Sequence, residues 1–301
     1  MGDRISIVEV GPRDGLQNEK AIIPTADKLR LIELLVAAGL RNIEATAFVS
    51  PKWVPQMADH DAVMRGIVRK EGVVYSALVP NEQGARNAIA AGAQVLAVFT
   101  SASETFARKN INCSIAESLD RFRPVIKLAR DNGLRVRGYV SCATDCPYEG
   151  EVQPDKVQAV ASALNRIGCD EIAVADTLGR GSPQRVRAML ERVLDRLRPE
   201  RLACHFHDTS GAALANVDVA LALGIRTFDS AAGGLGGCPY APGAAGNLRT
   251  GSLVRHLSER GFQTGVDLAS LDAAETFAST LKADTTPNGP QKGAFGSPAR
   301  A

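Results

Sequence analysis

The sequence lacks the features that would place this chain in a membrane or on a nucleic acid. No window approaches the ~20 consecutive apolar residues that a membrane-spanning helix needs, and Met1 to Ile5 form no apolar leader. Neither sign of charge is in excess, because 35 basic residues face 33 acidic residues and the net charge is +2. We therefore expect no membrane partner and no nucleic-acid partner.

Cysteine shows no pattern of pairing. The six cysteines are scattered, at positions 113, 142, 146, 169, 204 and 238. Scattered thiols in a chain of this size without a leader are typical of reduced, cytoplasmic proteins. Cys142 and Cys146 have no second pair of ligands at a matching spacing, which argues against a structural zinc site. The composition, 45% hydrophobic and 23% charged, is that of a globular protein with a large core.

What the sequence does contain is a regular alternation of strand-like and helix-like segments. The expected strands are Ile5–Val10, Asn42–Ala45, Val73–Leu78, Val95–Thr100, Arg135–Ser141, Glu171–Ala175, Leu202–Phe206 and Thr227–Ala231. The expected helices are Thr25–Ala38, His60–Arg69, Asn81–Ala91, Ser114–Asn132, Pro154–Ile167, Ser182–Leu197, Ala212–Leu223 and Asn247–Arg260. Strand and helix units at this even spacing predict an α/β fold, a (β/α)8 TIM barrel, rather than an open doubly wound sheet.

The end of the chain departs from this alternation. Leu268–Thr280 predicts one additional C-terminal helix. From Thr285 the chain is rich in Pro, Gly, Ser and Lys, which predicts a disordered tail over residues 285–301. We therefore expect a single barrel domain over residues 1–284.

His205 and His207 are two of only four histidines, and a single residue separates them at the end of a predicted strand. Side chains alternate faces along a strand, so both imidazoles point the same way and Phe206 points away. The pair is a candidate for metal binding, although two polar residues at a strand end need no metal. Active sites of (β/α)8 barrels lie at the carboxyl ends of the strands, where this pair falls.

Other reactive side chains follow the ends of predicted strands, and each has a structural alternative. They are Arg13, Asp14, Glu44, Asp176, Cys238 and Asn247. Asp14 is a turn former in its Pro-Arg-Asp-Gly context, and Asp176 is a candidate helix cap. A buried Glu44 needs a partner, so pairing with Arg13 serves structure as readily as catalysis. Cys238 lies in a Gly-rich loop, which over a barrel mouth is more often a lid than a place to bury a thiol.

Several long blocks of the sequence recur, in the same order, in a known family. The blocks are residues 8–20 (VEVGPRDGLQNEK), 48–57 (FVSPKWVPQM), 109–114 (KNINCS), 137–142 (RGYVSC), 146–150 (CPYEG) and 234–241 (GLGGCPYA). They resemble 3-hydroxy-3-methylglutaryl-CoA (HMG-CoA) lyases from about residue 5 to residue 280. That family belongs to a group of barrel metallolyases and Claisen-type synthases that share an Arg-Asp pair after strand one and a His-x-His after strand seven.

The resemblance implies a divalent cation, Mg2+ or Mn2+, bound by oxygen and nitrogen ligands. The matching ligand positions are Asp14, His205, His207 and Asn247. By the same resemblance, Arg13 stabilises an enolate and Cys238 transfers a proton to it from the lid. Glu44 and Asp176 match acids that support Arg13 and the proton chemistry. The base for the substrate hydroxyl is either Asp176 or His205.

The resemblance also implies an acyl-CoA substrate and a homodimer. Lys109, Asn110 and Ser114 precede or cap the helix after the fourth strand, where positive charge and backbone N–H groups are suited to a phosphate of the coenzyme. The family has Ser, Gly and Tyr where this chain has Ala47, Ala175 and Ser210. These changes flank the expected mouth and favour, as an alternative, a longer 3-alkyl substrate.

Three activities stay open from the sequence. Cleavage of HMG-CoA to acetyl-CoA and acetoacetate, with a place in leucine breakdown, is the leading hypothesis. A lyase for a related acyl-CoA is the second, and a Claisen-type synthase is the third, less favoured because of the Cys238 block. A barrel that binds a metal and CoA esters without catalysis is the alternative from a different class.

Overall fold

A computed structural model of the chain describes residues 3–17, 19, 21–236 and 246–282. Its parallel strands close into a barrel in the order β1-β10-β9-β8-β5-β4-β3-β2. The strands are β1 (Ser6–Glu9), β2 (Asn42–Ala47), β3 (Val74–Leu78), β4 (Val95–Ser101), β5 (Arg135–Ser141), β8 (Glu171–Asp176), β9 (Leu202–Phe206) and β10 (Thr227–Ser230). This closed barrel confirms the predicted (β/α)8 fold.

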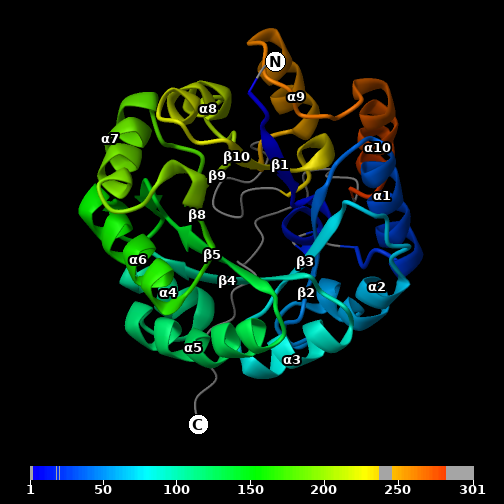
Figure 1. Cartoon of the computed structure of the whole chain (residues 1–301), viewed down its shortest axis with the longest axis horizontal. Helices are drawn as coiled ribbons and strands as arrows, with labels where there is room; N and C mark the ends of the chain where they lie inside the picture. The colour runs from blue at the N-terminus through cyan, green and yellow to red at the C-terminus, as the bar shows by residue number, and fades with distance from the viewer. Residues whose placement is uncertain (1–2, 18, 20, 237–245, 283–301) are drawn as a thin grey trace, which may run out of the picture.

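Helices surround the strands and cover the outer side of the barrel (Figure 1). They are α1 (Thr25–Ala37), α2 (His60–Gly66), α3 (Glu82–Ala90), α4 (Glu104–Ile111), α5 (Ile115–Asp131), α6 (Pro154–Ile167), α7 (Pro183–Leu194), α8 (Ala213–Ala222), α9 (Thr250–Glu259) and α10 (Leu268–Thr280). The last of these is the predicted additional helix, and it packs between α1 and α9. Within the described residues, no helix is both long and apolar enough to cross a membrane.

Local signals explain where several helices begin. The Asn81 side chain accepts a hydrogen bond from the Gly84 N–H (3.0 Å) and caps α3. Ser114 and Glu117 form a reciprocal capping box at the start of α5. The predicted N-caps therefore identified these helix starts correctly, because the cap interactions are local in sequence.

Two expected helices need corrected bounds, and two further features were not predicted. The helix expected from Asn247 begins at Thr250, because Asn247 pairs instead with His207 in an antiparallel bridge. The helix expected to reach Arg69 ends at Gly66, since Ile67 is extended. The helix α4 and the small hairpin of β6 (Asp145–Cys146) and β7 (Gly150–Glu151) had not been predicted.

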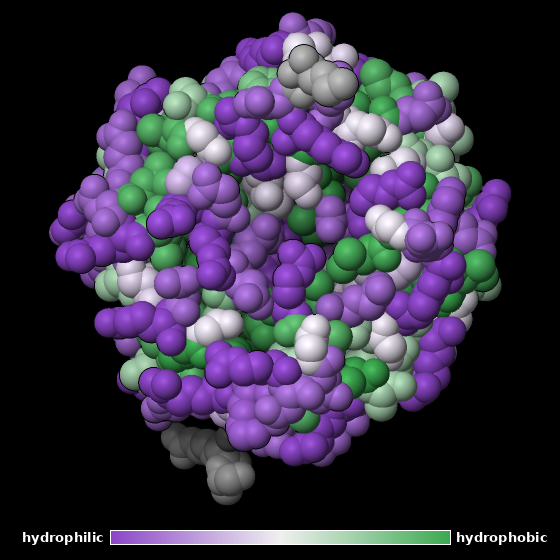
Figure 2. Space-filling model, in the orientation of Figure 1, coloured by the Kyte–Doolittle hydropathy of each residue, from purple (hydrophilic) through white to green (hydrophobic). Residues whose placement is uncertain are grey.

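The surface at one end of the barrel is largely hydrophilic, and its hydrophobic residues form only small scattered groups (Figure 2). The apolar side chains gather instead between strands and helices, where Leu35, Phe122, Leu164 and Phe228 are buried. Burial of these residues is the main stabilising term of the fold. The polar residues that are equally buried include those of the candidate site, which are Arg13, Glu44, Arg137, His205, His207 and Asp229.

Candidate metal centre and active site

Asp14, His205 and His207 come together at the carboxyl ends of β1 and β9. Asp14 lies in a π-helical turn, η1 (Gly11–Gly15), that follows β1 directly. One ligand atom from each of the three residues lies within 4.8 Å of the others, and the ring centroids of the two histidines are 5.2 Å apart. The two imidazoles therefore share one side of the strand, as the alternation of side chains predicted.

Asn247 joins this cluster from the segment between β10 and α9. Its Nδ2 donates to Asp14 Oδ2 (2.9 Å) and to the Leu235 carbonyl oxygen (3.1 Å). Its Oδ1 is buried with no hydrogen-bond partner among the described residues, and the same is true of His207 Nδ1. Buried polar atoms without partners are rare, and a cation fills this need. The donor set of carboxylate, imidazole and amide oxygen thus fits a divalent cation.

The protonation states of Asp14 and His207 also suit a cation. Burial opposes ionisation of Asp14, but Arg13 Nη1 lies 2.6 Å from Asp14 Oδ1, and Arg13 and the two histidines hold the pKa of this carboxyl well below its usual range. Burial, with a further contribution from His205, lowers the pKa of His207 to about 4. At neutral pH Asp14 is therefore a carboxylate and His207 a neutral imidazole, the forms that bind metals.

Arg13 is held from the side opposite Asp14 by Glu44. Arg13 Nε donates to Glu44 Oε1, and the Tyr139 hydroxyl donates to Glu44 Oε2 (2.8 Å). Glu44 lies in the middle of β2 rather than at its end, which corrects our expectation. All three side chains are buried, and the Tyr139 ring centroid is 5.8 Å from Arg13 Cζ. The predicted Arg13–Glu44 pair is present, and it aims a fixed positive charge beside Asp14.

The sequence analysis missed a second buried group, which lies beside His205. Asp229 Oδ2 lies 3.1 Å from His205 Nδ1, and Asp229 Oδ1 accepts from Arg137 Nη2 (2.6 Å). Asp229 sits in β10 and Arg137 in β5, and both charged side chains are buried. A charged residue inside a buried strand is itself a signal, because it requires a partner.

Glu9 is a further buried acid that the sequence analysis did not select. Its Oε1 accepts from the N–H groups of Gly11 and Ala232, both at 2.9 Å, and its Oε2 accepts from Thr250 Oγ1 (2.6 Å). A Cβ on Gly11 would lie 2.5 Å from this carboxylate, which explains the glycine. Burial raises the pKa of Glu9 to about 7 despite these hydrogen bonds. Glu9 thereby connects the loops that follow β1 and β10.

Asp176 lies at the end of β8, with its carboxylate directed into the loop that follows. Oδ1 accepts from Thr144 Oγ1 (2.6 Å) and from the Arg180 N–H (3.3 Å), and Oδ2 accepts from the Gly181 N–H (2.8 Å). Burial raises the pKa of Asp176, although these hydrogen bonds oppose the rise. The cap of α7 is Ser182, so Asp176 is not the helix cap considered as its alternative role.

The three residues expected to bind the coenzyme lie at the junction of α4 and α5. Lys109 Nζ is 4.7 Å from the ring centroid of Tyr148. The Ser114 N–H already donates to Glu117 Oε2 (2.7 Å), and the next N–H, of Ile115, donates to a glutamate of α4. The backbone donors that suggested a phosphate site are thus engaged by carboxylates, which leaves the side chains of Lys109 and Asn110 as the candidates.

Cys238 lies outside the described residues, but the chain on either side of it is placed. Gly236 has φ +91°, and a Cβ there would lie 2.7 Å from Asn247 Nδ2 and 3.4 Å from the Asp14 carbonyl oxygen. After the undescribed residues, the Gly246 carbonyl accepts from the Asp208 N–H (2.7 Å). Both ends of the Cys238 segment therefore lie beside the metal cluster.

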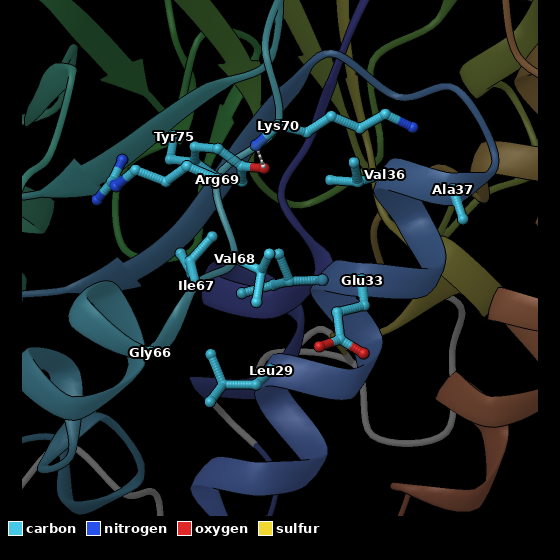
Figure 3. A pocket seen from close by; sticks show the side chains of 11 residues that line it. Leu29, Glu33, Val36, Ala37, Gly66, Ile67, Val68, Arg69, Lys70 and Tyr75 are labelled. Atoms are coloured by element: carbon cyan, nitrogen blue, oxygen red, sulfur yellow. Dashed lines mark hydrogen bonds between the residues drawn. The ribbon is translucent and has the colours of Figure 1, made fainter.

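Two cavities lie elsewhere and contain none of the predicted site residues. One, of about 310 Å³, is a groove between α1 and the segment that leads into β3; Leu29 and Val36 line one side, and Ile67 and Val68 the other (Figure 3). The second, of about 430 Å³, lies where β1, β2 and β10 begin. The candidate chemistry is thus at the opposite ends of these strands.

Comparisons with known proteins show the family of this chain. The HMGL-like family model matches residues 4–277. The mitochondrial hydroxymethylglutaryl-CoA lyase of Rattus norvegicus is 55% identical over 274 residues, which cover 91% of this chain and 84% of the relative. The cytoplasmic 3-hydroxy-3-methylglutaryl-CoA lyase of Mus musculus is 55% identical over 91% of this chain and 80% of its own length.

Solved structures give the same result. The HMG-CoA lyase from Brucella melitensis superposes with a TM-score of 0.92 at 53% identity, over 93% of this chain and 99% of that one. An HMG-CoA lyase from Acinetobacter baumannii, in complex with coenzyme A and 3-methylmalate, gives a TM-score of 0.88 at 36% identity, over 96% and 98% of the two chains. By fold, by sequence and by the residues gathered at the barrel mouth, this chain belongs to the HMGL-like family.

Proposed function

We propose that this chain is a divalent-cation-dependent lyase that cleaves HMG-CoA to acetyl-CoA and acetoacetate. The observation that carries the proposal is the juxtaposition of Asp14, His205 and His207 with the Arg13 guanidinium. The relatives with half of their residues identical to this chain are named as lyases of this substrate. The Arg13 guanidinium therefore lies beside the residues that would hold the cation, and one site would combine Lewis-acid chemistry with a fixed positive charge.

Asp14, His205, His207 and Asn247 would hold the cation, and Mg2+ or Mn2+ suits this mixed oxygen and nitrogen set. The bound cation supplies Lewis-acid chemistry, which lowers the pKa of the substrate hydroxyl and fixes its orientation. Arg13 stabilises the negative charge that develops on the thioester oxygen as the carbon–carbon bond breaks. Glu44 and Tyr139 hold Arg13 in place for this task.

Two proton transfers complete the reaction. His205 shares one ring nitrogen with Asp229 and has the other for the cation, so Asp176 is the better candidate to accept the hydroxyl proton. Burial raises the pKa of Asp176, which makes its carboxylate a stronger base than an ordinary aspartate. We assign the proton delivered to the enolate carbon to Cys238, because the ends of its loop lie beside the cluster.

The coenzyme portion of the substrate is assigned to the α4–α5 junction. Lys109 and Asn110 lie on α4 and Ser114 caps α5, so the three residues are near in sequence and in space. The lysine charge suits a phosphate of coenzyme A. Substitution of Lys109 by Ala is expected to raise KM for the acyl-CoA while leaving kcat near the wild-type value.

A longer 3-alkyl substrate is the second candidate, supported by the small residues near the mouth. Ala47 ends β2 and Ala175 lies next to Asp176 in β8. The Ser210 hydroxyl donates to the Gly179 carbonyl (2.5 Å), so Ser210 is tied to the loop that follows β8. None of the three contributes a large side chain that would exclude a longer alkyl group.

A paired turnover assay tests both candidates. The purified protein, loaded with Mg2+ or Mn2+, is given HMG-CoA and a longer 3-alkyl analogue, and kcat/KM is compared with an EDTA control. Faster cleavage of the methyl substrate, lost with EDTA, is the expected result. Preference for the longer analogue would select the second candidate, and no cleavage of either substrate would contradict both and favour the synthase or binding alternatives.

The wider context follows from the same proposal. We propose a role in leucine breakdown, a cytoplasmic location and a homodimer; the relatives include enzymes named cytoplasmic and others named mitochondrial. We also propose that residues 1–284 form one catalytic domain; the tail expected over residues 285–301 lies outside the described residues. Light scattering gives the oligomeric state, cell fractionation the compartment, and a truncation after residue 284 tests the tail through its turnover.

A further inference from the structure

The two histidines of the cluster are held very differently. His205 Nδ1 lies 3.1 Å from the buried Asp229 carboxylate, so one of its ring nitrogens is already committed. His207 Nδ1 is buried and has no hydrogen-bond partner among the described residues. The neighbouring rings thus present an asymmetric pair: one imidazole is fixed by a carboxylate, and the other is not.

Asp229 is itself fixed from two directions. It pairs with His205 in the register of β10 and β9, so the two residues lie side by side on adjacent strands. Its other oxygen accepts from Arg137 Nη2 (2.6 Å), and Arg137 is anchored further by Glu171, whose Oε1 lies 3.0 Å from Arg137 Nε. The Arg137 guanidinium can only donate, and at this hydrogen-bond distance it keeps the Asp229 carboxyl an acceptor.

We propose that Asp229, held by Arg137, is a positioning residue that keeps the His205 proton on Nδ1 and so presents Nε2 to the divalent cation. An acceptor-only carboxylate requires a donor on the facing nitrogen, which decides the tautomer. The second nitrogen is then left with a lone pair, the form in which imidazole binds a metal. This inference rests on the metal-dependent function proposed above.

The role of the unpartnered histidine follows from the same geometry. Among the described residues no carboxylate accepts from His207 Nδ1, so the orientation of this ring depends on the cation and on packing. Loss of Asp229 should therefore weaken the cation site through His205 alone. Removal of such a carboxylate partner typically costs about 10- to 100-fold in metal affinity.

The first test is a calorimetric titration of metal-free protein with Mn2+. Asp229→Asn keeps the shape of the side chain and removes its charge, and we expect Mn2+ to bind about 10- to 100-fold more weakly. Asp218→Asn is the matched control, because Asp218 pairs with His256 (2.8 Å) between α8 and α9, away from the cluster. Asp218→Asn should bind Mn2+ as the wild type does. An Asp229→Asn affinity within about threefold of the wild type overturns the proposal.

A second measurement needs no variant of Asp229 to fold. In ¹⁵N-histidine-labelled, metal-free wild type at about pH 9, where imidazoles are neutral, the nitrogen shifts report the tautomer. We expect the His205 proton on Nδ1, with the resonance assigned by its loss in His205→Gln. A proton on Nε2 overturns the proposal.

The two measurements also separate this inference from the proposed function. If the wild type binds Mn2+, shows the expected tautomer and loses affinity on Asp229→Asn, yet cleaves no HMG-CoA, the proposed function fails and the positioning role stands. If the wild type cleaves HMG-CoA but its His205 proton lies on Nε2, the positioning role fails and the function stands.

Discussion

The mouth of the barrel and the groove between α1 and the segment that leads into β3 differ in the residues that line them. At the mouth, Arg13, Glu44 and Asp229 are buried and each contacts a charged partner at hydrogen-bond distance. The groove in Figure 3 is a cavity of about 310 Å³ lined mainly by aliphatic residues, together with Glu33, Arg69, Lys70 and Tyr75, and its Val68 is 76% exposed. A cavity alone therefore does not identify the candidate site in this molecule. Buried polar side chains that pair with one another do.

The physical reason is the cost of burying charge. A buried ionised group is tolerated only when partners replace the lost water, so each member of the mouth cluster depends on its neighbours. An exposed apolar side chain on the groove has no such dependence. Substitutions should therefore have effects that decrease from the mouth to the groove, and four experiments test this gradient.

The largest effect is expected for Asp14→Ala. It removes the only carboxylate of the cation cluster formed by described residues, and a cation contributes several kcal/mol to the transition state. We expect kcat to fall by about 10³-fold or more, since each 1.36 kcal/mol is a factor of ten. The stabilisation of the folded protein by Mn2+ in thermal melts should disappear as well. Asp272→Ala, an exposed residue paired with Arg255, is the control and should change neither property.

A smaller loss is expected for Glu44→Gln, which removes the charge paired with Arg13. Arg13 retains Asp14 as a partner but loses the contact that fixes its orientation. We expect kcat to fall by about 10²-fold, comparable to removal of one stabilising donor, and stability to fall by about 3 kcal/mol. Steady-state kinetics and urea unfolding measure the two effects. Wild-type kcat in this variant would show that Arg13 needs no carboxylate from β2.

A pH-dependent effect is expected at Glu9. Burial raises the pKa of this carboxyl from 4.5 to about 7. The folded state then binds a proton more tightly than the unfolded state, so this group's stabilisation falls as pH rises from about 4.5 to 7 and is constant above. Over this interval the free energy of unfolding of the wild type, relative to that of Glu9→Gln, should fall by up to about 3 kcal/mol. Urea unfolding of both proteins across the pH range measures it. A difference that does not change with pH contradicts the raised pKa.

The smallest effect is expected in the groove. Val68→Ser replaces an exposed apolar side chain, so stability should change by less than about 0.5 kcal/mol. HMG-CoA turnover should equal that of the wild type, because the groove contains no residue of the cluster. A reduced kcat would show that the groove influences the mouth and would contradict the contrast drawn between the two regions.

Much of the site was predictable from local patterns, and the reasons are visible in individual residues. The His205–His207 pair was found because strand alternation puts both rings on one side. The Arg13–Glu44 pair was considered because a buried acid needs a base. Asn247 was selected by its place after the eighth predicted strand, and the family resemblance supplied its role as a ligand; the predicted helix was wrong there, because a bridge to His207 holds Asn247 before α9 begins at Thr250.

Other residues had no local signal strong enough to select them. Tyr139 has the pattern of an ordinary aromatic residue in a strand, yet its hydroxyl donates a hydrogen bond to Glu44. Arg137 and Asp229 are 92 residues apart and meet only because β5 and β10 face the same barrel interior. The backbone donors expected to hold a phosphate near Ser114 are engaged by glutamates, which a cap motif by itself does not reveal.

The sequence alone determined the alternation of strands and helices, the helix caps and the side of β9 on which the two histidines lie. These features depend on residues a few positions apart, through side-chain period and cap hydrogen bonds. Tertiary structure alone decided which buried polar groups meet. It pairs Tyr139 with Glu44, and it places Asp229 between Arg137 and His205. Closure of the barrel brings distant strands to one interior, and the cost of burying an unpaired charge then selects the partners.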